Sequence, residues 1–165
     1  SYGYGVKSPT SARLNSRGRK RTKKWESIAP YKSQYELKVA DTLTKAEIDF
    51  QYEPKKIKYI YPTKRGRCKT CGGSDVGRLA TYTPDFWFPK HRFWVEAKGK
   101  WDSAGRTKTL AVLDSDNELN RDNFAMLFMY NNWVTRTHTQ RYTDWCDKHE
   151  IVCAVGTEIP MEWLK

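Results

Sequence analysis

The sequence predicts a single α/β domain in which helices flank a mixed β-sheet. Three observations lead to this fold class. A capped amphipathic helix is expected from Ser33, stretches of alternating apolar and polar residues then indicate strands, and residues 124–130 form a continuous apolar run of strand length. Such a run is typical of a strand buried on both faces of a sheet that helices cover. The expected order is α-β-β-β-α-β-α-β-α over residues 29–165.

Composition limits the classes of function. The chain has 165 residues and a formal net charge of +11, which favours a polyanionic partner, nucleic acid before an anionic membrane surface. No apolar run approaches the roughly 18 residues of a membrane-spanning helix. Four cysteines in a long, lysine-rich chain do not indicate a disulfide scaffold. We therefore expect a cytoplasmic, reducing setting and no membrane partner.

Residues 1–28 are predicted to be a flexible basic arm. The first 24 residues contain no acid, and Gly, Ser, Pro and Thr separate the cations, so this segment cannot bury a core of its own. We favour contact with DNA phosphates over a solubilising or localisation tail, because the whole chain is basic. The cations expected to bind DNA are Lys7, Arg13, Arg17, Arg19, Lys20, Arg21, Lys23 and Lys24.

The first helix begins at a capping box, in which Ser33 is followed three residues later by Glu36. Leu37, Ala40 and Leu43 supply its apolar stripe. Glu36 lies on the flank of that stripe, and two interpretations remain open from the residues alone. It is either the capping carboxylate or an acid directed at a metal site. A strand over 57–61 and a polar, Gly-rich insertion at 63–78 follow the helix.

Residues 82–98 carry the central motif. We interpret them as two strands joined by a short turn at 89–91, a hairpin that brings Asp85 near Glu96 and Lys98. Alternation places Glu96 and Lys98 on one face, and it groups Tyr82 with Phe86 on the face opposite Asp85. Carboxylate oxygens are the ligands that Mg²⁺ prefers, and a neighbouring lysine can activate water or stabilise developing negative charge.

This PD…ExK pattern resembles the metal-dependent nuclease superfamily with the restriction-endonuclease-like fold. The alternative is a surface hairpin with scattered charges, since short matches of this kind arise by chance.

After the hairpin we expect a helix from Asp102 or Ser103 to about Leu119, a helix over 140–150, a strand over 151–155 and a terminal helix over 158–165 with Pro160 at its first position. Lys100 and Arg106 are added to the expected DNA-binding cations.

The order and spacing of the motifs resemble the phage endonuclease I family of Holliday-junction resolvases, from about residue 33 to the C-terminus. The matching motifs are SQYELKVADTL, FQYEP, YTPDFWFP, FWVEAKGKW and IPMEWLK. The chain departs from the family in its longer insertion at 63–78 and in Lys100. The resemblance implies metal-dependent hydrolysis of phosphodiesters in branched or four-way-junction DNA.

The resemblance also implies roles for particular residues. Asp85, Glu96 and the backbone carbonyl of Ala97 would bind a divalent metal, and Glu36 would complete a second metal position. Two Mg²⁺ or Mn²⁺ ions would then serve each active site. Lys98 would help activate water or stabilise the transition state, and Glu53 corresponds to a further family acid. The family further implies a strand-exchanged homodimer, in which Glu36 of one chain joins Asp85, Glu96 and Lys98 of the other.

Cys68 and Cys71 have the C-x₂-C spacing of half a structural zinc site. Three possibilities stay open: a site shared between two chains, a site completed within one chain by a residue such as His91, or no zinc. Cys146 and Cys153 are expected in the core.

Three functions are weighed. The structure-selective DNA endonuclease is favoured over a sequence-specific restriction or homing endonuclease, which the same core could support. A non-catalytic DNA-bridging protein is disfavoured, because a pure binder gains nothing from acids that face phosphate.

Overall fold

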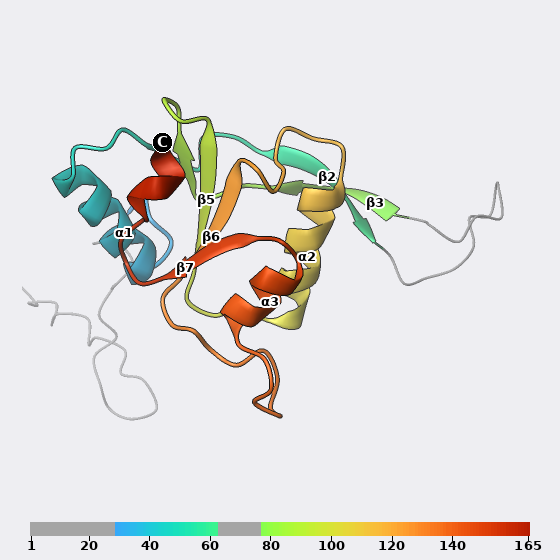
Figure 1. Cartoon of the computed structure of the whole chain (residues 1–165). Coiled ribbons are helices and arrows are strands. Elements are labelled where there is room, and N and C mark those ends of the chain that lie inside the picture. Colours follow the sequence, from blue (N-terminus) through green and yellow to red (C-terminus); the bar gives the residue numbers. More distant parts are fainter. Residues whose placement is uncertain (1–28, 63–76) are drawn as a thin grey trace, which may run out of the picture.

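A computed structural model describes residues 29–62 and 77–165 of the chain (Figure 1). The predicted arm 1–28 and most of the insertion, with Cys68 and Cys71, lie outside these described residues. The fold is a five-stranded sheet and a separate two-stranded sheet, packed with three α-helices and a 3-10 helix. In chain order the elements are α1 (Gln34–Lys45), β1 (Gln51–Tyr52), β2 (Ile57–Pro62), β3 (Gly77–Tyr82), β4 (Phe86–Phe88), β5 (Phe93–Lys98), α2 (Ser103–Asp114), β6 (Phe124–Phe128), α3 (Tyr142–Lys148), β7 (Val152–Val155) and η1 (Met161–Leu164).

The main sheet is mixed, as predicted. Its strand order is β1-β4-β5-β6-β7. The pairs β1–β4 and β4–β5 are antiparallel, whereas β5–β6 and β6–β7 are parallel. All five residues of β6 are buried, which confirms the strand predicted from the apolar run. Lys98 at the end of β5 is in register with Phe128 at the end of β6, so both strands finish at the same edge of the sheet.

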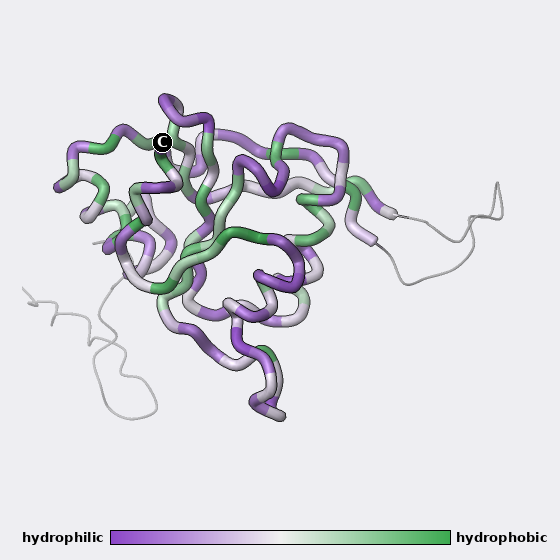
Figure 2. Tube along the Cα trace, in the orientation of Figure 1, coloured by the Kyte–Doolittle hydropathy of each residue, from purple (hydrophilic) through white to green (hydrophobic). Residues whose placement is uncertain are grey.

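Helices cover both faces of this sheet, which confirms the predicted α/β fold class. On one face α1 and the C-terminal η1 pack over a cluster that includes Val95 and Leu127. On the other face α2, α3 and the β2–β3 hairpin enclose a cluster built around Trp94, Trp101 and Phe128. Figure 2 shows hydrophobic residues along the central strands and mostly hydrophilic residues in the exposed connections. None of the helices in the described part of the chain is both long and apolar enough to cross a membrane.

The first helix begins where the sequence predicts. The Ser33 side chain accepts a hydrogen bond from the Glu36 backbone N–H at 3.1 Å, so Ser33 is the N-cap. The reciprocal half of the capping box differs from expectation, because the Glu36 carboxylate accepts from the Lys32 N–H at 3.0 Å instead of from the Ser33 N–H. Ile48 lies beyond the end of the helix, although its backbone N–H still bonds to the Leu43 carbonyl.

The predicted hairpin differs from the structure at its first strand. Chain alternation grouped Tyr82 with Phe86 on one face, but Tyr82 packs in the cluster under α2 and Phe86 packs in the cluster under α1. The reason is a break at residues 83–85, where the chain leaves the β2–β3 sheet and enters the main sheet. Pro84 supplies no backbone N–H for a strand ladder at this point.

Three other boundaries predicted from sequence are wrong. Helix α2 ends at Asp114 and not near Leu119, and the Ser115 hydroxyl then donates to the Ala111 carbonyl at 2.7 Å. Helix α3 covers only Tyr142–Lys148, because an isolated bridge between Trp133 and Arg141 precedes it. The C-terminal turn is a 3-10 helix in which Pro160 is the N-cap residue and not the first helical residue.

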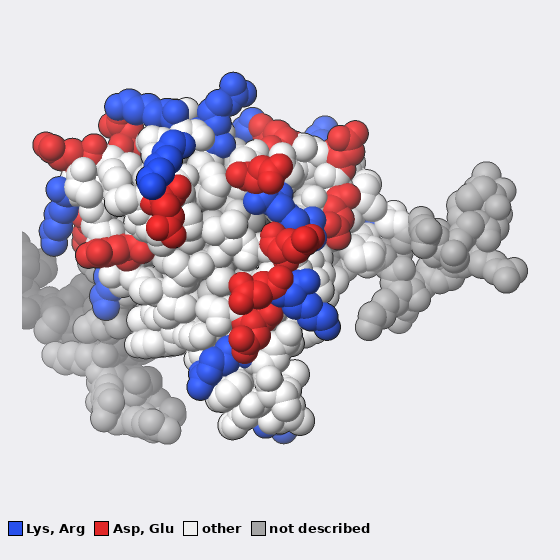
Figure 3. Space-filling view, in the orientation of Figure 1, with Lys and Arg blue, Asp and Glu red and all other residues white. Residues whose placement is uncertain are grey.

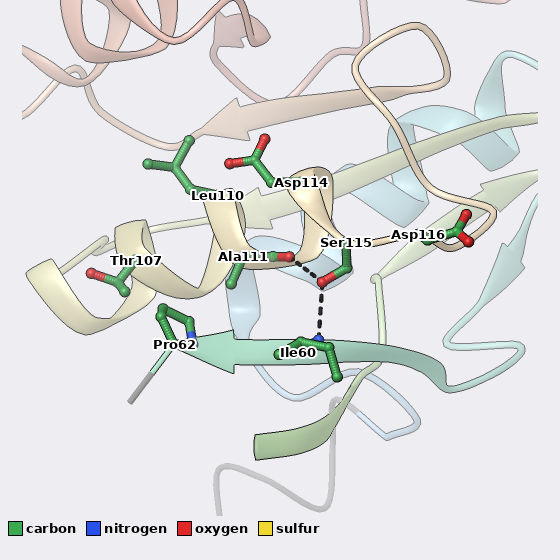
Figure 4. A pocket seen from close by; sticks show the side chains of 8 residues that line it. All are labelled: Ile60, Pro62, Thr107, Leu110, Ala111, Asp114, Ser115 and Asp116. Atoms are coloured by element: carbon green, nitrogen blue, oxygen red, sulfur yellow. Dashed lines mark hydrogen bonds between the residues drawn. The ribbon is translucent and has the colours of Figure 1, made fainter. Parts of the chain in front are cut away.

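The β2–β3 hairpin rests on α2. The Ser115 Oγ atom accepts a hydrogen bond from the Ile60 N–H at 2.9 Å, beside a hollow that apolar and polar residues of β2, α2 and the chain just after α2 line together (Figure 4). Gly77, which pairs with Pro62, is required because a Cβ atom there would lie 2.1 Å from a methyl group of Ile60. Ile60 and Leu79, which pair across the hairpin, leave 50% and 66% of their surface exposed, so two apolar side chains lie side by side on its outer face next to Lys58 and Thr81.

Candidate active site

Two buried carboxylates lie where β4 and β5 meet. Asp85 immediately precedes β4, and Glu96 is the fourth residue of β5. They are 7% and 3% exposed, and apart from Thr109 they are the polar or charged residues buried within the described part of the chain. Burial of two carboxylates side by side is costly unless hydrogen bonds or cations compensate. The burial of these two acids therefore needs a chemical explanation.

Backbone groups hold both carboxylates in place. The Asp85 N–H donates to Glu96 Oε2 at 3.2 Å, and the Ala97 N–H donates to Asp85 Oδ2 at 2.9 Å. Each strand therefore binds the acid of the other, just past the Phe86–Val95 pair of the β4–β5 ladder. These two backbone hydrogen bonds help to fix the direction of both carboxylates.

The electrostatic environment disfavours a negative charge on Asp85. Burial, followed by the negative charges of Glu96 and Glu36, raises the pKa of Asp85 to about 9. The Ala97 N–H and the Lys98 ammonium act in the opposite direction but do not compensate. A cation placed against the two carboxylates would remove this penalty.

Lys98 supplies part of the missing positive charge. Its Nζ atom lies 2.8 Å from Glu96 Oε1, and 39% of its side chain is exposed. Burial lowers the pKa of Lys98, but the negative charges of Glu96, Asp85 and Glu36 outweigh burial and raise it above its ordinary value. Lys98 is therefore a cation at neutral pH, with its ammonium reachable from solvent.

The buried Tyr82 hydroxyl lies beside Glu96, a neighbour of the site that sequence reasoning missed. Burial raises the pKa of Tyr82 well above its ordinary value, and the charges of Glu96 and Asp85 raise it further. Its hydroxyl stays protonated and can donate toward the acids. No local pattern could have placed it there, because its position depends on the chain break at residues 83–85.

Glu36 lies close to this pair but does not join it. Its carboxylate accepts hydrogen bonds from the Ser33 hydroxyl and from the Tyr52 hydroxyl. It is near enough for its charge to act on Asp85 and Lys98 of the same chain. Across residues 29–62 and 77–165, however, no three His, Cys, Asp or Glu side chains are assembled closely enough to hold a metal ion.

Glu53 is placed by the backbone next to Asp85. Its own backbone has a positive φ of 45°, and its N–H donates to the Asp85 carbonyl at 2.8 Å. Its side chain forms an ion pair with Lys32. Lys32 and Tyr52 thus connect Glu53 and Glu36 into one polar group at the start of α1, which the sequence indicated only through the FQYEP motif.

The donor set suits a hard divalent cation. Asp85 and Glu96 offer carboxylate oxygens, the ligands that Mg²⁺ and Mn²⁺ prefer, and a bound cation would offset the burial and the neighbouring negative charges that raise the pKa of Asp85. No histidine or cysteine among the described residues lies in a metal-ligating group, so the residues do not form a zinc-type site here.

The positive charge of the chain is unevenly distributed. Segments 1–28 and 63–76 together carry 12 of the 30 Lys and Arg residues but only 2 of the 19 Asp and Glu residues. The described domain therefore has a formal charge of only +1, and acidic and basic side chains intermingle on the face shown in Figure 3. Of the predicted DNA-binding cations within it, Lys100 is exposed. Arg106 donates to the Trp101 carbonyl at 2.7 Å and is therefore partly engaged within the fold.

Other predicted side chains belong to the core or the surface. Trp101 is buried, as is Cys146, whereas Cys153 is only partly buried. His149 packs against the Trp145 ring, and His91 lies in the turn between β4 and β5. None of these residues lies in the group around Asp85 and Glu96.

Known proteins resemble this chain in sequence over most of its length. The family model described as phage endonuclease I matches residues 17–165. Endonuclease I of Escherichia phage T7 is 30% identical over 141 residues, covering 84% of this chain and 80% of the relative. Endodeoxyribonuclease 1 of Enterobacteria phage T3 is 32% identical over 124 residues, covering 75% of this chain and 70% of the relative.

Proposed function

Because the chain belongs to the phage endonuclease I family, we propose that it is a structure-selective DNA endonuclease that resolves four-way and other branched junctions. One observation carries the proposal: two buried carboxylates and a protonated lysine converge where β4 and β5 meet. A protein that only binds DNA has no use for a buried pair of acids whose charges repel phosphate. Catalysis of phosphodiester hydrolysis explains why the fold buries these two acids although their burial is energetically unfavourable.

The substrate class follows from charge. DNA phosphates would be attracted by the strongly basic segments 1–28 and 63–76, whereas the domain around the acids is nearly neutral. Contacts of this kind depend on the positions of the phosphates and do not distinguish one base sequence from another. Selectivity for a branch would then arise from the shape of the DNA and from where its strands diverge.

Asp85 and Glu96 would hold the metal, with the Ala97 carbonyl beside them, and Glu36 would complete a second position after its carboxylate turns away from Tyr52. Mg²⁺ or Mn²⁺ bound there would lower the pKa of water and stabilise the leaving oxygen. The protein's own contribution is the orientation of the acids, which the Asp85 and Ala97 N–H groups fix before any ligand arrives.

Lys98 would act as a cation and not as a base. Its pKa is raised by the surrounding acids, so its ammonium keeps its proton at neutral pH and can bind the scissile phosphate as negative charge develops there. Tyr82 would stay protonated behind Glu96 and help keep that carboxylate aligned.

Cleavage of three matched DNA substrates tests the proposal. The protein, Mg²⁺ and end-labelled DNA are incubated with a four-way junction, with a linear duplex of the same arm sequences, or with plasmid. Paired nicks near the branch are expected. Discrete cuts in linear duplex would instead indicate a sequence-specific endonuclease, and tight binding without cleavage would indicate a bridging protein. Asp85→Asn should abolish cutting and keep junction binding; normal cutting by this variant would place the active site elsewhere.

We also infer a strand-exchanged homodimer. The exposed apolar pair Ile60 and Leu79 on the outer face of the hairpin offers surface for a second chain. In the single chain Glu36 already lies within electrostatic range of Asp85. Exchange of α1 and β1 between two chains would keep these contacts and supply Glu36 from the partner.

A mixed dimer distinguishes exchange from a self-contained site. Chains carrying Glu36→Gln are co-expressed with differently tagged chains carrying Asp85→Asn, and the doubly tagged dimer is purified. Each variant alone should be inactive. If sites are shared between chains, the mixed dimer contains one intact site and nicks a junction once. If every site is built from one chain, both of its sites are damaged and no nicking is seen.

Zinc at Cys68 and Cys71 is a separate proposal about residues outside the described part of the chain. A Cys₄ site shared by two chains predicts one zinc per dimer in protein purified without added metal. Cys68→Ser should then remove the zinc and weaken the dimer. One zinc per monomer would favour a site within each chain, and zinc-free protein with an unchanged dimer would refute both forms.

A further inference from the structure

A projecting segment connects β6 to α3 and starts beside the candidate active site. We call residues 130–141 the β6–α3 arm. Met129, directly before the arm, donates its N–H to the Lys98 carbonyl at 3.0 Å, and the Asn132 amide donates to the Gly99 carbonyl at 3.5 Å. The arm therefore leaves the sheet at the edge where β5 delivers Lys98. In Figure 1 it is the orange loop that extends beyond α3.

The arm has the composition of a surface that meets a polyanion. The chain from residue 123 to residue 143 contains no Asp or Glu, although the described domain as a whole is nearly neutral. Arg136 is exposed and forms no ion pair with any residue in the described part of the chain. Tyr130 and Trp133 are 61% and 38% exposed. Positive charge, hydroxyl groups and aromatic rings without acids are typical of nucleic-acid contact.

Internal contacts give the arm a defined shape. The Arg141 guanidinium lies 3.8 Å above the Trp133 ring, and its Nη1 atom donates to the Asn131 carbonyl at 2.8 Å. The His138 ring stacks on Trp133 at 5.2 Å. The Val134 N–H donates to the Gln140 carbonyl at 2.8 Å and closes the base of the loop. Binding to such an arm loses less conformational entropy than binding to an unstructured loop.

The tip carries further hydrogen-bonding groups. The Thr135 and Thr137 hydroxyls lie 2.7 Å apart, and the Thr137 and Thr139 hydroxyls lie 3.3 Å apart. All three threonines are exposed, and Arg136 lies between the first two in sequence. Hydroxyl donors that alternate with an arginine suit the oxygens of successive phosphates.

We propose that the β6–α3 arm binds the phosphate backbone of the DNA beside the scissile phosphate, with Arg136 as its principal cation. This inference rests on the proposed function in one respect, that the substrate is DNA. Arg136 is a positioning residue, since it would hold the strand while Asp85, Glu96 and Lys98 face the reacting phosphate. Trp133 maintains the shape of the arm by stacking with Arg141 and His138.

The test compares Arg136→Ala with Lys148→Ala, an exposed cation in the last turn of α3, the end of that helix farther from the arm. Binding of a labelled four-way junction is measured by fluorescence anisotropy over a series of salt concentrations, with both changes made in the Asp85→Asn protein to prevent cutting. Arg136→Ala should raise Kd by about 3- to 10-fold, and the slope of log Kd against log salt should decrease by about one phosphate contact. Lys148→Ala should leave both quantities unchanged.

Cleavage kinetics in the otherwise unmodified protein supply a second readout. Arg136→Ala should raise KM and leave kcat within about two-fold, because uniform binding is lost. Trp133→Ala should reproduce the loss of affinity, and Trp133→Phe should restore most of it by keeping an aromatic platform. Unchanged Kd and salt slope for Arg136→Ala would overturn the inference, even if the protein cuts junctions. Weakened binding by this variant in a protein that cuts no DNA would refute the endonuclease and leave the arm supported.

Discussion

In the metal-free protein, the free energy of unfolding should fall as the pH rises, and replacing Asp85 by Asn should abolish this fall. Burial and the charges of Glu96 and Glu36 raise the pKa of Asp85 to about 9, whereas an aspartate in the unfolded chain has its ordinary pKa near 4. Between these values the folded protein keeps a proton that the unfolded chain has released. The stabilising contribution is therefore complete below about pH 4 and is lost as the pH rises toward 9.

The magnitude follows from the width of this interval. The free energy of unfolding should fall by about 1.4 kcal/mol for each pH unit in which only the folded state is protonated. Between pH 5 and pH 8 the wild-type protein should lose about 4 kcal/mol relative to Asp85→Asn. Asparagine is a suitable comparison, because its side-chain oxygen can still accept from the Ala97 N–H, now 2.9 Å from Asp85 Oδ2.

Urea unfolding in the presence of EDTA measures this difference at pH 5, 6, 7 and 8. Subtracting the variant from the wild type removes the contribution of titrating groups far from the site and leaves that of Asp85 together with its neighbours Glu96 and Glu36. Adding Mn²⁺ at pH 8 should restore stability to the wild type and have little effect on the variant. A wild-type-minus-variant difference that stays constant from pH 5 to pH 8 would show that Asp85 is an ordinary carboxyl and would refute the electrostatic description of the site.

Three further predictions concern the surroundings of the site. Lys98→Gln should lower the single-turnover cleavage rate by about 10²- to 10³-fold and leave junction affinity within about three-fold; an equal loss in both would make Lys98 a binding residue only. Tyr52→Phe removes the hydroxyl that bonds to Glu36 and should cost about 1 kcal/mol in urea unfolding, and no change would mean that the bond contributes nothing in solution. Gly77→Ala places a Cβ atom 2.1 Å from the Ile60 methyl and should cost about 1–3 kcal/mol; a double-mutant cycle with Ile60→Ala should recover most of that loss, whereas additive effects would contradict the close approach.

Local sequence patterns predict the features of the fold that depend only on residues close together in the chain. The alternation in FWVEAK predicts that Trp94 lies on the opposite face from Val95 and Ala97, and the two core clusters confirm it. Ser33 was recognised as a helix start because an N-cap acts within one turn. The apolar run predicted β6 for the same reason, since burial on both faces leaves no polar residue in the strand.

Longer-range features could not be read from the sequence. Strand alternation across Tyr82 and Asp85 failed because the chain changes sheets between them, and alternation holds only within one strand. The direction of the Glu36 carboxylate depends on Tyr52, which is 16 residues away. The β6–α3 arm escaped notice because its stacking of Trp133 and Arg141 follows no helical or strand period.

The connection at residues 83–85 has a mechanical consequence. Three residues, one of them the rigid Pro84 and the last of them Asp85, join β3 of the hairpin sheet to β4 of the main sheet. The connection is too short to absorb a rotation, so a turn of the hairpin against the main sheet would also turn the Asp85 carboxylate away from Glu96. A partner that rotated the hairpin would therefore change the spacing of the two acids. Dimer assembly and catalysis would then be coupled through the short connection at residues 83–85.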